Sequence, residues 1–320
     1  SMVFTPLIIL IIPLVASSLA NFPIVRTSYG SVRGYEYRTK SGFVGEIFKK
    51  IPYASPPIGF RRWQKPEPPE PWNYTIDGTF FGPICAQKYF FSGYSSDSSE
   101  DCLLLNVYTS KECRESKGSC PVLHYVYGGA HLFGGGQMFP DESLVMKYAS
   151  RGIVLVTIGY RVGFFGVLAL GDENVVPANL EMHDVLESLR FVRKEIHNFG
   201  GNKDKISLMG HSSGAELVFM LTFSPVVNKP GETPLFERAI PMSGSLIFEE
   251  EAEMVKRSHR VATKLGCTGS AREIVECLRP LSTELELTHK IESSSSASDL
   301  NGVILAGELM PVRSVRELME

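Results

Sequence analysis

The sequence lacks a strong excess of either charge. Its 320 residues carry 32 Lys and Arg against 35 Asp and Glu, which gives a net charge of -3 and a pI near 6.2. The basic residues between 49 and 65 are few and scattered, so they indicate a solvated surface rather than a basic stripe. Proteins that bind nucleic acid usually carry such a stripe. The composition therefore argues against nucleic acid as a partner.

Metal-ligand motifs are also missing. The sequence contains no CxxC, no HExxH and no cluster of Cys and His with the spacing of a metal site. We therefore predict neither a metal nor another cofactor.

The six cysteines are spaced as three local pairs: Cys85 with Cys102, Cys113 with Cys120, and Cys267 with Cys277. Six cysteines allow fifteen connectivities, and buried unpaired thiols are the alternative, so the spacing leaves the pairing open.

A membrane-spanning apolar run is absent as well. The run from Leu7 to Val15 is shorter than the roughly 20 residues that a spanning helix needs. Small residues from Ser18 to Ala20 suit a cleavage site, so we predict a signal peptide at residues 1–20 and the mature domain at 21–320, although the first residues lack Lys and Arg. An uncleaved anchor and a buried strand are the alternatives. Export to the cell exterior or the secretory lumen agrees with the cysteine pairs and with a glycosylation acceptor at Asn73.

The remaining chain alternates short apolar runs with helical patterns. The runs at 103–108, 122–127, 153–158, 206–209 and 239–242 are typical of strands covered on both faces. Residues 24–53 suggest an antiparallel ribbon, and further helices are predicted at 249–265, 271–278 and 314–320. The clearest helix runs from Leu180 to Asn198, with Glu181 and Glu187 off its apolar face. This alternation predicts an α/β fold with a mostly parallel central sheet and helices on both faces.

Ser212 is the candidate nucleophile. It lies in the segment Gly210-His211-Ser212-Ser213-Gly214, between an apolar strand and a helical stretch. Small residues around a serine at a sharp strand-to-helix turn leave its hydroxyl open to an ester carbonyl. This five-residue pattern is not specific by itself, so its context decides.

The context includes candidate donors for an oxyanion. The segment Tyr127-Gly128-Gly129-Ala130 directly follows a predicted strand, and its small residues would let backbone N–H groups approach a developing negative charge. The N–H of Ser213, at the start of the next helix, would add a third donor. A plain glycine turn is the alternative for this loop.

These motifs together resemble those of the type-B carboxylesterases, the family that includes the cholinesterases. The nucleophile signature of that family resembles residues 199–214, FGGNKDKISLMGHSSG, and its second signature resembles residues 100–107, EDCLLLNV. Segments at 51–59, 160–163, 235–240 and 243–245 match in the same order. The resemblance extends from about Pro23 to the end of the chain. It implies an α/β-hydrolase fold whose C-terminal part is missing from this sequence.

The resemblance also implies roles for individual residues. Ser212 would be the nucleophile, and the N–H groups of Gly129, Ala130 and Ser213 would form the oxyanion hole. The pairs Cys85 with Cys102 and Cys267 with Cys277 match family disulfides, whereas Cys113 with Cys120 would be an addition.

Several residues depart from the family pattern. His211 stands where Glu is usual, Ser213 where Ala is usual, and Ala130 where a third glycine is usual. The loop from 85 to 102 has four aromatic residues, Tyr89, Phe90, Phe91 and Tyr94, but no Trp. The choline-binding indole of the cholinesterases is therefore missing, which disfavours acetylcholine as the substrate.

The acid and base of a catalytic triad are not found after the serine. In this family both follow the nucleophile, and residues 301–319 resemble the stretch just before the acid. The only later histidines are His259 and His289, both in polar, helix-like contexts that favour a surface position.

We therefore predict a secreted serine carboxylesterase acting on small-molecule esters through Ser212, with this chain inactive as written. The alternative is a non-catalytic cholinesterase-like adhesion ectodomain. The sequence does not fix the substrate or the oligomeric state.

Overall fold

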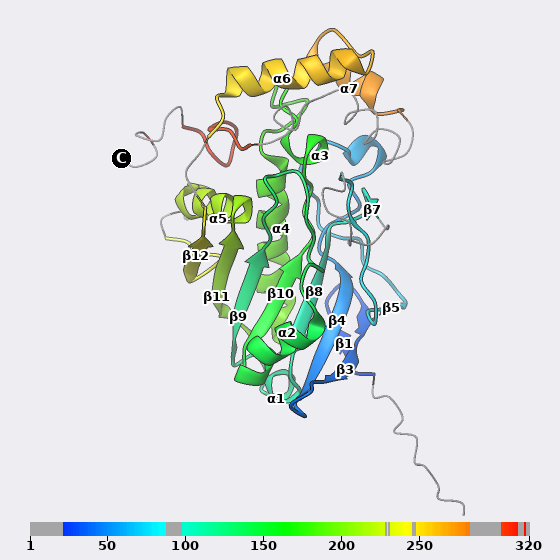
Figure 1. Ribbon diagram of the computed structural model, residues 1–320, viewed down its shortest axis with the longest axis vertical. Coiled ribbons are helices and arrows are strands. Elements are labelled where there is room, and N and C mark those ends of the chain that lie inside the picture. The colour runs from blue at the N-terminus through cyan, green and yellow to red at the C-terminus, as the bar shows by residue number, and fades with distance from the viewer. Residues whose placement is uncertain are drawn as a thin grey trace, which may run out of the picture.

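Seven strands form the central sheet, in the order β12-β11-β9-β10-β8-β4-β3 (Figure 1). The computed structural model describes residues 22–87, 98–227, 229, 231–244, 248–281, 302–312 and 317. The predicted signal peptide and the aromatic residues of the 88–97 loop lie outside these ranges. The strands are β3 (Tyr35–Arg38), β4 (Val44–Pro52), β8 (Leu104–Thr109), β9 (Cys120–Val126), β10 (Val154–Ile158), β11 (Gly201–His211) and β12 (Arg238–Met242). All five predicted runs are confirmed as strands of this sheet, but the expected burial on both faces is wrong for β12, on which Ile240 and Met242 are exposed.

The sheet is mixed. The strands β10, β9, β11 and β12 are parallel neighbours, with Val122 of β9 opposite Val154 of β10 and Ile206 of β11. The pairs β10 with β8, β8 with β4, and β4 with β3 are antiparallel. A short loop joins β3 to β4 and turns at Gly42, whose φ of 90° suits glycine, and such a short connection can only join antiparallel strands.

The first strands also form two smaller sheets. The strand β1 (Ile24–Arg26) pairs antiparallel with β2 (Ser31–Arg33), which pairs parallel with β5 (Thr75–Asp77). The strands β6 (Ile84–Cys85) and β7 (Ser98–Ser99) pair in parallel. The predicted N-terminal antiparallel ribbon is therefore present, and β4 joins it to the central sheet.

Helices cover both faces of the sheet (Figure 1). Successive residues of a strand point to opposite faces. On β9, His124 Nε2 lies 3.0 Å from Ser188 Oγ of α4, whereas the next residue, Tyr125, packs its ring against Phe139 on the side of α2. The helices are α1 (Lys111–Glu115), α2 (Asp141–Lys147), α3 (Phe164–Val167), α4 (Leu180–Glu195), α5 (Ser213–Phe223), α6 (Glu251–Lys264) and α7 (Ala271–Leu278), with short 3-10 turns η1 (Gly59–Arg61), η2 (Ala149–Arg151) and η3 (Ile196–Phe199).

The predicted helices at 249–265 and 271–278 are confirmed as α6 and α7, while the one at 314–320 lies almost wholly outside the described residues. Within the ranges given above, no helix has the length and apolar character needed to span a bilayer.

The helix α4 differs from its predicted amphipathic pattern. Glu181 and Glu187, which the periodicity placed off the apolar face, are both buried. The reason is that α4 packs against α3 and α5 as well as against β11, so little of its surface reaches solvent. These two carboxylates are therefore buried although they lie off the apolar face of the helix.

Three disulfides hold the chain, and they are the three local pairs expected from the spacing. Cys85 is bonded to Cys102, Cys113 to Cys120, and Cys267 to Cys277. The first links β6 to the segment before β8, the second links α1 to β9, and the third links α7 to the loop after α6.

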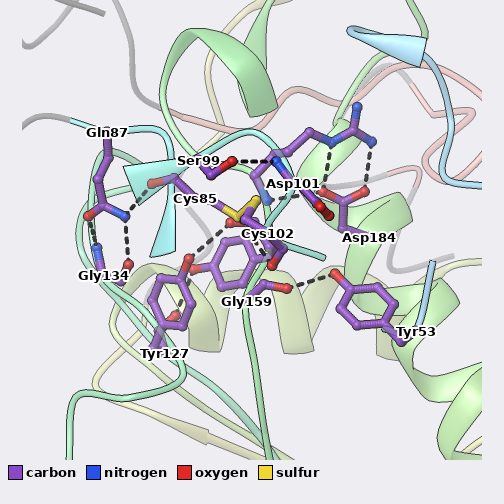
Figure 2. Close-up of a disulfide and its surroundings, with 12 residues drawn as sticks. Tyr53, Cys85, Gln87, Ser99, Asp101, Cys102, Tyr127, Gly134, Gly159 and Asp184 are labelled. Carbon is purple, nitrogen blue, oxygen red and sulfur yellow. Dashed lines mark hydrogen bonds and ion pairs between the residues drawn. A yellow bond between two sulfur atoms is a disulfide. The ribbon is translucent and has the colours of Figure 1, made fainter. Parts of the chain in front are cut away.

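A buried ion pair fixes the first turns of α4 against the end of β10. Arg161 Nε and Nη2 donate to the two carboxylate oxygens of Asp184 at 2.8 and 2.7 Å, and the Arg161 backbone N–H donates to the same carboxylate at 3.0 Å. The exposed fractions of the Arg161 and Asp184 side chains are 3% and 0%. Figure 2 shows Asp184 and its ion pair among the residues that surround the Cys85–Cys102 disulfide. Because both side chains are removed from water, each charge needs the opposite charge of its partner to offset the cost of burial.

We predict that Asp184→Asn lowers the free energy of unfolding by about 3 kcal/mol, since it leaves the Arg161 charge buried without a counter-charge. The matched control is Glu237→Gln, because the Arg238–Glu237 pair is 60% and 42% exposed and such pairs contribute less than about 1 kcal/mol. Urea unfolding of both variants tests the difference. Equal effects at the two positions would contradict a structural role for the buried pair.

Candidate functional site

Ser212 lies at the junction between β11, which ends at His211, and α5, which begins at Ser213. Its φ of 55° and ψ of -127° are rare for any residue other than glycine, and such a conformation costs about 1 to 3 kcal/mol. Glycines make the turn possible. A Cβ on Gly210 would lie 2.2 Å from the Gly214 carbonyl oxygen, and one on Gly214 would lie 2.3 Å from the Tyr127 carbonyl oxygen. Backbone contacts this close cannot relax, so both positions require glycine.

The glycine loop after β9 lies directly against this turn. A Cβ on Gly128 would lie 2.8 Å from Ser212 Cβ and 2.2 Å from the His211 carbonyl oxygen. A Cβ on Gly129 would lie 1.9 Å from the Phe133 carbonyl oxygen, because the loop folds back on itself. The parallel pairing of β9 with β11 brings the two segments together, since the ends of neighbouring parallel strands meet at the same edge.

The candidate oxyanion donors are in different situations. The Gly129 N–H donates to Ser213 Oγ at 3.0 Å, and the Ser213 side chain is buried. The Ala130 N–H has no hydrogen-bond partner among the described residues, and Ala130 has a φ of 54°. Ser213 begins α5, so its N–H belongs to the first turn, whose N–H groups have no partner within the helix. Thus the structure brings Gly128 and Gly129 against the Ser212 turn, with Ala130 next in the same loop, but the Gly129 N–H is already bonded to the Ser213 hydroxyl.

A buried histidine beside this loop was not identified from the sequence. His131 Nδ1 lies 2.7 Å from Glu181 Oε1, and His131 Nε2 lies 2.9 Å from Glu216 Oε2. Burial alone would lower the pKa of His131, but the two carboxylates outweigh it and raise the pKa to about 10. The side chain is therefore an imidazolium at neutral pH. No motif in the sequence pointed to this cluster, because its members come from three distant segments.

Gln87 holds the far end of the same loop. Its side-chain amide donates to the carbonyl oxygens of Cys85 and Gly134 at 2.8 and 2.7 Å, and its Oε1 accepts the Gly134 N–H at 2.6 Å (Figure 2). Tyr127, at the start of the loop, donates its hydroxyl to the Tyr160 carbonyl oxygen at 2.9 Å. The glycine loop is therefore anchored on both sides of the Gly128–Ala130 segment.

Histidines that could serve Ser212 as a base are not found near it in the described parts of the chain. No hydrogen bond joins the Ser212 hydroxyl to a histidine there. His211 is exposed, and His259 lies on α6. Burial lowers the pKa of His124 and of His183 to about 3, so both are neutral. His289 lies outside the described residues.

Two other predicted features can be placed. Asn73 is exposed, in the loop before β5, where a glycan would meet no steric obstacle from burial. In the described ranges, no three His, Cys, Asp or Glu side chains are grouped closely enough to hold a metal ion.

Known proteins resemble the chain along most of its length. The model of the carboxylesterase family matches residues 21–311. Gut esterase 1 of Caenorhabditis briggsae is 37% identical over 260 residues, which cover 80% of this chain and 43% of that protein. Juvenile hormone esterase of Tribolium castaneum is 36% identical over 270 residues, which cover 82% of this chain and 44% of that protein. The chain thus spans about half the length of the curated relatives it matches.

Solved structures of esterases are also similar to this chain. The crystal structure of juvenile hormone esterase from Manduca sexta, with OTFP covalently attached, superposes with a TM-score of 0.80 at 27% identity, covering 93% of this chain and 56% of that one. The carboxylesterase EST55 of Geobacillus stearothermophilus gives a TM-score of 0.75 at 31% identity, covering 91% of this chain and 57% of that one. The predicted α/β-hydrolase fold is confirmed, and the chain belongs to the carboxylesterase family.

Proposed function

We propose that the protein is a serine hydrolase that cleaves small carboxylic esters through an acyl-enzyme on Ser212. The observation that carries this proposal is the strained backbone of Ser212 against the Gly128–Ala130 loop. A residue is held in such a conformation only where the surrounding structure enforces it, and strain of this kind clusters at functional sites. A serine at this point presents its hydroxyl next to backbone N–H groups, which is the arrangement that acyl transfer requires.

The reaction follows from these groups. The Ser212 oxygen forms a bond to the ester carbonyl carbon as its proton passes to a base, and the carbonyl oxygen becomes an oxyanion facing Ala130 and Ser213. The tetrahedral intermediate collapses, and the alcohol leaves with a proton. Water then attacks the acyl-enzyme by the same steps, releasing the acid and restoring the Ser212 hydroxyl.

A base for Ser212 is not present in the described residues, so the full reaction needs groups beyond them. Loss of the base in comparable triads reduces the rate by about 10⁴ to 10⁶. We therefore expect the 320-residue chain alone to hydrolyse esters very slowly. The competing proposal is a non-catalytic binding ectodomain, which would be favoured if the natural protein had no acid and histidine downstream of Ser212. Against it, a binding surface gains nothing from a strained serine with an adjacent N–H loop.

The first test compares the natural reading frame containing this chain with its Ser212→Ala variant. The variant is expected to lose at least about 10³ in the rate of p-nitrophenyl acetate hydrolysis. A fluorophosphonate probe is expected to label Ser212, located by peptide mass spectrometry, in the natural protein only. Ser207→Ala, on the strand β11 that leads to Ser212, is the control and should leave both readouts unchanged. Equal turnover by the isolated 320-residue chain and the natural protein would show that a base lies within residues 1–320.

The second test concerns the hydroxyl of Ser213. In the structure this hydroxyl accepts a hydrogen bond from the Gly129 N–H. That hydrogen bond must break before the Gly129 N–H can bind an oxyanion. One such hydrogen bond contributes about 1 kcal/mol, so Ser213→Ala is expected to raise kcat about fivefold with KM unchanged. Steady-state kinetics on an aryl ester measures this. A lower kcat would instead mean that the hydroxyl supports the loop.

A further inference from the structure

The segment after Gly129 has an unusual backbone. Ala130 and His131 have φ values of 54° and 60°, both in the left-handed region that residues with a Cβ seldom occupy. Two such residues in succession persist only where surrounding contacts enforce them. The direction of the Ala130 N–H depends on this backbone. The contacts of His131 therefore help to hold a candidate oxyanion donor in place, beside the Gln87 and Tyr127 contacts that anchor the two ends of the loop.

Those contacts reach two helices. The His131 side chain is 5% exposed and lies between Glu181, which is 0% exposed, and Glu216, which is 18% exposed. Glu181 belongs to the first turn of α4 and Glu216 to the first turn of α5, the helix that begins after Ser212. The His131 carbonyl oxygen also accepts the Gly163 N–H at 2.6 Å. One side chain thus connects the glycine loop to the starts of two helices.

The buried carboxylates of this cluster require the positive charge of His131. Each carboxylate is favoured by the positive end of its helix dipole, but the fully buried Glu181 also needs a counter-charge. The neighbouring cation, Arg161, is already committed to Asp184. Among the described residues, His131 is the ion-pair partner of both Glu181 and Glu216. It also offsets the negative charge that Glu216 places in the first turn after the nucleophile.

We propose that His131 is a positioning residue for ester hydrolysis, which orients the Ala130 N–H toward the oxyanion by joining the glycine loop to Glu181 and Glu216. This inference rests on the proposed function. His131 itself does not touch the reacting atoms. The expected consequence is a loss of transition-state stabilisation with little effect on substrate binding.

The protonation of the cluster gives a test that does not involve activity. The groups that act on His131 are Glu181 on α4 and Glu216 on α5. Asp184 on α4 acts on Glu181, and Glu181 in turn helps to raise the pKa values of the buried hydroxyls of Tyr127 and Tyr160. With these neighbours the pKa of His131 is about 10, above its ordinary value of 6.5.

A group whose pKa is raised by folding stabilises the protein fully below its unfolded pKa and loses this effect as the pH rises through the folded one. We therefore expect the difference in unfolding free energy between the natural protein and His131→Gln to shrink as the pH rises from about 6.5 to about 10. Urea titrations across this range measure it. A difference that is constant or grows with pH would contradict a charged His131.

The kinetic test uses the natural reading frame and a trifluoromethyl ketone, which forms a tetrahedral serine adduct with an oxyanion. His131→Gln is expected to lower kcat about 10- to 100-fold and to keep KM within about twofold. The affinity for the trifluoromethyl ketone should fall by the same factor as kcat. His197→Gln is the matched control, since His197 is exposed in η3 after the end of α4. It should change none of these quantities.

Glu216→Ala provides a second variant in case His131→Gln does not fold. It removes one contact of His131, at a side chain that is partly exposed. We expect kcat and the affinity for the ketone to fall about tenfold. Glu216→Gln should restore most of this loss because it keeps an acceptor oxygen. The proposal is contradicted if the natural protein hydrolyses esters and folded His131→Gln matches it in kcat and in ketone affinity. If His131→Gln does not fold, the same result for Glu216→Ala contradicts the proposal. If the natural protein shows no Ser212-dependent hydrolysis, the proposed function itself fails.

Discussion

The close approach of the Gly128 loop to the Ser212 turn is the constraint on which the site depends. Backbone atoms of the two segments lie so near each other that a single added Cβ at Gly128 would overlap the His211 carbonyl oxygen. This distance is set by the sheet, because β9 and β11 are adjacent and parallel and end at the same edge. Gly210 and Gly214 then let the chain reverse into α5 without moving away from that edge. The geometry of the candidate site therefore follows from strand order combined with the absence of side chains at Gly128, Gly210 and Gly214.

Much of this could be predicted from local sequence. The buried strands appear as apolar runs because both of their faces are covered, and the turn at Ser212 is visible because glycine is sterically required on each side of it. The antiparallel half of the sheet was less visible. The run that became β8 looks like the runs that became the parallel strands β9, β10 and β11, although β8 is antiparallel to its neighbours β10 and β4, since periodicity reports burial and does not report direction.

The buried charges could not be predicted, for a different reason. Glu181 follows the helical period that normally places a carboxylate in water, and only the packing of α4 against α3 and α5 buries it. Its partner His131 is 50 residues earlier in the numbering and lies in a loop, where histidine has no periodic signature. Ser213 likewise looks like a conservative small residue, and its bond to the Gly129 N–H appears only in three dimensions. Local patterns locate elements, whereas pairings between distant polar groups depend on how those elements meet.

The position of β12 has a consequence for how long the serine keeps its geometry. This strand is the outermost in the described sheet, and Ile240 and Met242 are 38% and 36% exposed on it. Yet the Ser212 N–H donates to the Met242 carbonyl oxygen at 2.9 Å, so the turn is hydrogen-bonded to an edge strand, whose neighbour in the described sheet is β11 alone. Edge strands open locally at a lower free energy than central ones. Amide hydrogen exchange at Ser212 would therefore follow the opening of β12, and anything that pairs with this edge would lengthen the lifetime of the observed Ser212 conformation.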